Sequence, residues 1–153
     1  MKRVLAVGIG LAVMMSLVSF GTDACAASKE EAKAMVKKVE AYYKANGKEK
    51  TLAEVQKNNG QFERGEIYVY IYDMTSTVLL AHPKLPTWVG KKFAGLKDAD
   101  GKSFTRQSLD ELANKDECRI TYRWNNPETK KIGVKHGYFL KVDGMVFAAG
   151  VWE

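Results

Sequence analysis

The chain contains few residues that could build a metal or cofactor site. Its 153 residues hold two histidines and two cysteines, and none of the patterns H-E-x-x-H, C-x-x-C or C-x-x-C-H is present. Zinc and haem sites need such clustered ligands, so the sequence predicts no metal and no cofactor. Neither Cys118 nor any serine has a base and an orienting residue recognisable in the sequence, as nucleophilic catalysis requires. We therefore expect a protein that is not an enzyme.

Long apolar runs are also scarce, and the only one lies at the N-terminus. Lys2 and Arg3 precede the apolar run 4–20, and the small residues Ala24-Cys25-Ala26 follow it. This order is typical of a secretory signal peptide cleaved after Ala26, and it predicts a periplasmic or secreted protein. A membrane anchor formed by an uncleaved signal is the weaker alternative, because no cationic stop follows the run.

Cleavage would leave a chain without a disulfide, because Cys118 would be its only cysteine. Residues 27–153 suit a single domain, so the predicted organisation is a signal peptide at 1–26 and one domain at 27–153. The formal net charge is +6, but lysines alternate with acidic residues along the chain. Together with export, this dispersed charge predicts no nucleic-acid partner.

Helical periodicity dominates the first part of the predicted domain. From Ser28 to Ala45, apolar or small residues recur at three- and four-residue steps, and Ser28 with Glu31 forms a capping-box pattern. Asn46-Gly47 is a helix stop signal. A second short helix is predicted over Lys50–Lys57.

After Gly65 the period of the sequence changes to two. Residues 67–72 alternate β-branched residues with tyrosines, which predicts a strand, and the chain then turns into a second strand at 78–81. Further expected elements are a long irregular segment at 82–103, a short helix at 104–114, and strands at 118–124, 132–142 and 145–152. The order indicates an α+β domain with helices packed on an antiparallel sheet.

The most informative stretch is Tyr122–Glu128, followed by Lys135 and Tyr138. If the flanking segments are paired strands, aromatic rings and a proline-bearing turn surround one cation, which suits a small anionic or zwitterionic solute. Tyr122 and Trp124 share a strand face, so both can line one wall. A buried Lys135 ammonium needs an anion such as a ligand carboxylate; the alternative is a solvent-facing lysine.

Further residues extend this candidate site. Buried hydroxyls of Tyr70 and Tyr72 need partners that a polar ligand would supply. His82 is either a hydrogen-bond donor to a carboxylate or a structural loop histidine. Tyr138 stands three positions from Lys135, so the two share a cavity only if Gly137 introduces a bulge. The predicted ligand-binding residues are Tyr70, Tyr72, His82, Tyr122, Trp124, Lys135 and Tyr138.

Several stretches match one known family pattern, in the expected order. They are Tyr70–Asp73 with Leu80–Pro83, Gly90–Phe93, Leu96–Phe104, Tyr122–Thr129 with Lys135 and Tyr138, and Ala149–Trp152. Through them the chain resembles the single Cache domain, a PAS-like extracytoplasmic sensor of bacterial chemoreceptors and histidine kinases. The resemblance implies a long N-terminal helix packed on a five- or six-stranded antiparallel sheet. It also implies a cavity between the sheet and the loop-and-helix segment, for a small carboxylate, an amino acid or a related metabolite.

This resemblance predicts an exported small-molecule-binding sensor domain. Receptor members of the family are bracketed by two transmembrane helices, whereas this chain has at most one, so it resembles the solo, secreted members. Its signal would then leave through a partner protein such as a membrane receptor, a kinase or a transporter. The alternatives are an accessory module that docks on a membrane receptor or transporter and, more remotely, an enzyme acting on a small acid.

Overall fold

The structure is a computed structural model that describes residues 28–153. The predicted signal peptide and its cleavage site after Ala26 lie outside the described residues. Among the helices of residues 28–153, none is long and apolar enough to span a bilayer.

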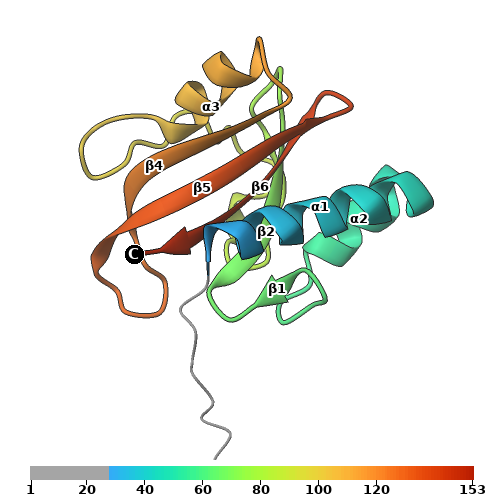
Figure 1. Cartoon of the computed structure of the whole chain (residues 1–153), viewed down its shortest axis with the longest axis horizontal. Helices are drawn as coiled ribbons and strands as arrows, with labels where there is room; N and C mark the ends of the chain where they lie inside the picture. Colours follow the sequence, from blue (N-terminus) through green and yellow to red (C-terminus); the bar gives the residue numbers. More distant parts are fainter. Residues whose placement is uncertain (1–27) are drawn as a thin grey trace, which may run out of the picture.

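Six antiparallel strands form the sheet at the centre of the domain (Figure 1). They are β1 (Glu63–Arg64), β2 (Ile67–Asp73), β3 (Leu79–Ala81), β4 (Glu117–Asn125), β5 (Ile132–Val142) and β6 (Met145–Trp152). The strand order is β1-β2-β6-β5-β4, and β3 pairs with β2. The last strand in the sequence, β6, therefore lies at the centre of the sheet, between β2 and β5.

Helices cover both faces of this sheet. Helices α1 (Lys29–Asn46) and α2 (Lys48–Val55) lie on one side, and α3 (Phe104–Leu112) packs on β4 from the other. The predicted capping box is present, since the Ser28 hydroxyl accepts from Glu31 N and the Glu31 carboxylate accepts from Ser28 N. Helix α2 begins two residues earlier than predicted, because Gly47, with φ of 80°, ends α1 and is also the N-cap of α2. The α+β architecture predicted from the sequence is confirmed.

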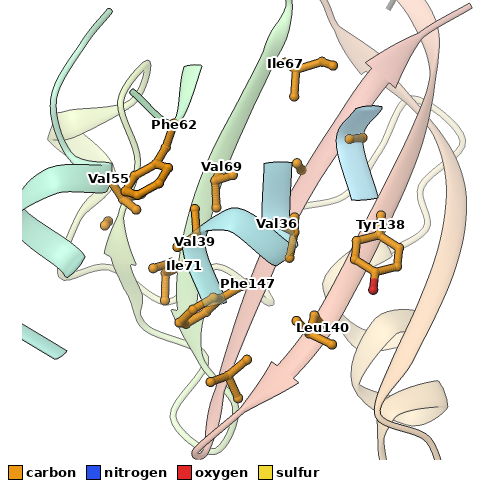
Figure 2. Close-up of a cluster of buried hydrophobic side chains, with 14 of the residues drawn as sticks. Val36, Val39, Val55, Phe62, Ile67, Val69, Ile71, Tyr138, Leu140 and Phe147 are labelled. Atoms are coloured by element: carbon orange, nitrogen blue, oxygen red, sulfur yellow. The ribbon is translucent and has the colours of Figure 1, made fainter. Parts of the chain in front are cut away.

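Strand β2 separates the two layers of side chains. Its isoleucines and valine join α1 in one buried cluster, which we call the helix face of the sheet (Figure 2). Its tyrosines, Tyr68, Tyr70 and Tyr72, point to the opposite side and join α3 and residues 82–103 in a second cluster. We call this side the tyrosine face and residues 82–103 the covering loop. The alternation therefore places aliphatic packing on one side and hydroxyl-bearing rings on the other.

The three C-terminal strands form the predicted antiparallel meander, with continuous pairing from Glu117↔Leu140 to Asn125↔Ile132 and from Lys135↔Trp152 to Val142↔Met145. Two short elements escaped the sequence prediction. They are β1, which is two residues long, and a 3-10 turn, η1 (Pro86–Trp88), inside the covering loop. Neither is long enough to produce a periodic signal.

Burial on the helix face predicts a measurable difference between two isoleucines. Ile71 is fully buried, whereas Ile132 is 57% exposed. We expect Ile71→Val to lower the free energy of unfolding by about 0.5–1.5 kcal/mol, because it leaves a methyl-sized void in the core. The matched substitution Ile132→Val should change it by less than about 0.5 kcal/mol. Chemical denaturation of both variants measures the difference; equal effects would contradict the burial described here.

Candidate functional site

Lys135 lies at the centre of the tyrosine face, although it is a lysine in a sheet core. It is 2% exposed. Its Nζ donates to the Tyr68 hydroxyl at 2.9 Å, and lies 4.3 Å from the centre of the Tyr68 ring and 4.8 Å from that of Trp152. Burial opposes the charged form, but the oxygens of Tyr68 and Tyr122 outweigh it and the pKa of Lys135 lies above its ordinary value. The side chain is therefore a buried cation at neutral pH.

Two glycines in neighbouring strands make room for this side chain and its neighbours. A Cβ at Gly150 would stand 2.9 Å from Lys135 Cε, and one at Gly137 would stand 2.7 Å from Phe139 Cε2 and 3.1 Å from Tyr122 Cε1. Gly137 and Gly150 are paired across β5 and β6. The floor of the tyrosine face is thus backbone, on which the lysine stem and the Tyr122 ring can lie flat.

His82 forms part of the roof over Tyr68 and Tyr70. Its ring lies 5.2 Å from the Tyr68 ring and 5.4 Å from the Tyr70 ring, nearly parallel to the latter. His82 Nδ1 accepts from the backbone N–H groups of Lys84 and Leu85, so the ring proton of the neutral form is on Nε2. Burial, together with the charges of Lys135 and Lys84, lowers the pKa of His82 to about 3. This histidine is therefore a neutral donor.

Tyrosine hydroxyls complete the polar part of the cluster. Tyr122 is paired with Lys135 across β4 and β5, and its ring stacks on Phe104 at 4.3 Å. The Tyr70 hydroxyl is fully enclosed and has no hydrogen-bond partner within the described residues. Burial, with Tyr122 beside it, raises the pKa of Tyr70 well above its ordinary value, so this hydroxyl stays protonated. The Tyr70 and Tyr122 hydroxyls are close enough to shift each other's pKa, but their geometry is too poor for a hydrogen bond, so the Tyr70 hydroxyl is a costly buried group that a bound polar group or water would satisfy.

No acidic side chain neutralises the Lys135 ammonium directly. Within residues 28–153, Lys135 forms no ion pair with a carboxylate, and the charge of Glu66 is the smallest of the causes that raise the pKa of Lys135. The side chains around the ammonium are aromatic rings and hydrogen-bond donors, and a tyrosine oxygen accepts its hydrogen bond. Such a site has unused donors for an anion.

Little free space remains around these groups. A hollow of about 10 Å³ lies against the outer side of Tyr68 and Trp152. That volume is about one water-sized sphere, which is too small for an organic ligand. Lys135, Tyr70 and Tyr122 are also almost completely buried, so the site is closed in this structure.

Two predicted residues lie at the margin of the cluster. The Tyr72 hydroxyl is 2.7 Å from Ser108 Oγ and is occupied in fixing α3 to the sheet. Trp124 is half-buried, is paired with Gly133, and meets Phe104 edge-on at 5.4 Å. Both rings support the tyrosine face, but neither contacts the Lys135 ammonium.

Tyr138 is not part of this cluster, and the prediction that placed it beside Lys135 is wrong. Strand β5 is regularly paired on both sides of Gly137, so no bulge interrupts its alternation. Tyr138 therefore points to the helix face, where Figure 2 shows it among the core residues. Its hydroxyl donates to Glu117 Oε2 at 2.6 Å.

Sequence reasoning missed Tyr68 and Trp152, the two rings that contact the ammonium. The sequence contained a signal that could have identified each of them. Tyr68 belongs to the same alternating stripe as Tyr70, and counting outward from a two-residue turn at Asp143-Gly144 places Trp152 opposite Lys135.

For metal ions, the described residues contain no group of three or more histidine, cysteine or acidic side chains that could act as ligands.

The structure is an α+β domain with an enclosed cation-aromatic cluster, and comparison with known proteins gives its family. The Single Cache domain 2 family matches residues 11–145, and the chain belongs to this family of sensory domains. The resemblance seen in the sequence is thereby confirmed. The match begins inside the predicted signal peptide, so the boundary at residue 27 stays a prediction. No curated protein matches the chain significantly.

Solved structures share the fold. A methyl-accepting chemotaxis protein from Vibrio parahaemolyticus is similar with a TM-score of 0.64 and 24% identity, over 81% of this chain and 87% of that one. A Cache chemosensory domain described for carboxylic acid recognition gives 0.59 and 20%, over 80% and 86%. The periplasmic sensor domain of a chemotaxis protein gives 0.60 and 18%, over 80% and 88%.

The lowered pKa of His82 predicts a loss of stability in mild acid. Between pH 6.5, the ordinary value, and about 3, the unfolded chain binds a proton at His82 that the folded chain does not. Stability should therefore fall as the pH is lowered, with a slope approaching about 1.4 kcal/mol per pH unit. His82→Asn keeps an acceptor for the turn and should flatten the slope between pH 6.5 and 4.5. His136→Gln is the control and should keep it; denaturation curves at several pH values decide.

The charge of Lys135 contributes to this low value, which gives a second test. Because the ammonium lowers the pKa of His82, replacing it with the neutral chain of Lys135→Met should move the His82 pKa upward. An NMR titration of the two histidine rings measures the shift. A His82 titration unchanged by Lys135→Met would show that the two groups are not neighbours in solution.

Proposed function

We propose that this protein is an exported sensor domain that binds a small carboxylate, with Lys135 as the anchor of the carboxylate group. The observation that carries the proposal is a buried ammonium that no acidic side chain pairs with, among rings and hydroxyls. A bound carboxylate would accept charge-assisted hydrogen bonds from Nζ, each contributing roughly 1.5–3 kcal/mol. The expected contacts are Lys135, Tyr68, Tyr70, Tyr122 and His82.

The same groups favour acids without an amino group over amino acids. An α-ammonium bound beside Lys135 would meet a like charge, and the nearby His82 ring offers only its Nε2–H because Nδ1 is already occupied. The Tyr68 hydroxyl is the acceptor that Lys135 Nζ contacts, and it is already occupied by that hydrogen bond. Like charges at short range in a buried site are costly. Among the ligands that the family resemblance leaves open, we favour the simple organic acids.

The structural neighbours support this proposal by analogy. One is described as a Cache domain that recognises carboxylic acids, and another as a periplasmic sensor domain of a chemotaxis protein. We infer the same setting for this chain, with cleavage after Ala26 and a membrane receptor, kinase or transporter as the partner that receives the signal. Fold likeness alone does not carry function, so the buried cation remains the main support.

A matched pair of ligands tests the proposal. Propionate and alanine differ by one ammonium group, so thermal unfolding with each should show stabilisation by propionate and little by alanine. At a propionate concentration of 100 times the dissociation constant, binding adds about 2.7 kcal/mol to the free energy of unfolding. Calorimetric titration gives the constant, and a wider set of acids can follow.

Two lysine variants make the result specific. Lys135→Met keeps the stem but removes the ammonium, and should abolish stabilisation by propionate. Lys131→Met removes an exposed lysine in the turn between β4 and β5, just before β5, and should leave the stabilisation unchanged. Stabilisation that survives Lys135→Met, or an absence of binding by every simple acid tried, would refute the proposal.

A further inference from the structure

We propose that the Trp152 indole is the movable wall of the Lys135 site, and that a ligand enters when this ring swings outward. The inference rests on the proposed function, because it assigns an entrance to that site. It starts from the closed state of the cluster: the adjoining hollow has a volume of about 10 Å³, so a ligand can reach Lys135 only if a wall moves. The site has two movable candidates, the covering loop and Trp152.

The covering loop is fixed at its start by paired hydrogen bonds. His82 N donates to Gln56 Oε1 at 3.0 Å, and Gln56 Nε2 donates back to the His82 carbonyl at 3.1 Å. Lys84 Nζ donates to Asn58 Oδ1 and forms an ion pair with Glu63. Opening this end would break several bonds together.

The next part of the covering loop is fixed to β3 and its preceding turn. Leu79 N donates to the Lys91 carbonyl, Gly90 N donates to the Leu79 carbonyl, and Phe93 N donates to the Thr77 carbonyl. Phe93 is also buried between Tyr70 and Phe104. The roof over the tyrosines is therefore an unfavourable place to open.

Trp152 is held much less firmly. Within the described residues its indole N–H makes no hydrogen bond, and it is half-buried at the end of β6. It rests on Gly133, where a Cβ would stand 3.3 Å from the ring. Gly133 has no side chain, so on this side no side chain holds the ring in place. Its known attraction is to the Lys135 ammonium at 4.8 Å, which a ligand carboxylate would replace.

The hollow beyond the ring marks the direction of entry. It lies between the turn at Gly65-Glu66 and the turn at Asn126–Glu128, and it touches both Tyr68 and Trp152. Within residues 28–153, no backbone or side-chain hydrogen bond joins these two turns. Figure 1 shows the C-terminal end of β6 beside the β4–β5 connection. Outward rotation of Trp152 would join the hollow to the ammonium.

Chemical accessibility of Lys135 tests the wall without any ligand. The purified protein is treated with N-hydroxysuccinimidyl acetate, and acetylation of Lys135 is followed by peptide mass spectrometry. Trp152→Ala should raise the acetylation rate at Lys135 by at least about tenfold, because local opening no longer has to move the ring. Trp152→Phe retains a ring and should stay close to the wild-type rate. Trp88→Ala, in the covering loop, should also stay close to it.

Alkylation of the buried Cys118 in the same samples reports global loosening. It should stay slow in each variant. Unchanged Lys135 acetylation in Trp152→Ala, an equal rise in Trp88→Ala, or a parallel rise at Cys118 would each overturn the inference. A failure of organic acids to bind would refute the proposed function. The acetylation experiment needs no ligand, so its rates would still show whether Trp152 controls access to Lys135.

Discussion

The structure depends on accommodating one cation inside a sheet. Lys135 fits there because Gly150 has no side chain and because the Tyr68 hydroxyl accepts a hydrogen bond from the ammonium. Two aromatic rings also face its charge. Two strands supply these conditions: β2 contributes Tyr68, and β6 contributes Gly150 and Trp152. The sheet order that places β6 between β2 and β5 is what brings them together. The site is therefore a property of the whole sheet.

A single strand divides this domain into two functional layers. The aliphatic side chains of β2 pack against α1, while its tyrosines face the covering loop. The aliphatic core and the proposed binding site are thus placed on opposite sides of the same backbone. Tyr138 illustrates the rule, because its position on the alternation of β5 assigns it to the helix face, where its hydroxyl binds Glu117. Tyr138 is close to Lys135 in sequence, but it lies on the opposite face of the sheet and contacts different groups.

Most of the fold could be predicted from periodicity, since the helix at α1 and the strands at β2, β5 and β6 are long and regular. Strands flanking one turn predicted that Lys135 lies beside the aromatic rings, but the pairing of Tyr122 with Lys135 is a finding of the structure. The pairing of β2 with β6 could not be predicted in this way, because it joins residues far apart in sequence, and it is this pairing that brings Tyr68 to the ammonium. The closed state of the cavity depends on side-chain packing, which periodicity does not describe.

The pairing of Gly137 with Gly150 has a consequence for comparing related chains. A Cβ at position 150 would stand 2.9 Å from Lys135 Cε, so a larger residue there requires the lysine side chain to shift, and positions 135 and 150 are coupled. A glycine at the first position of a G-x-W motif in the last strand, with a lysine two residues before a glycine in the preceding strand, is thus a sequence marker. Relatives that carry both halves should share this buried cation, and those that have lost one half should recognise a different chemical group.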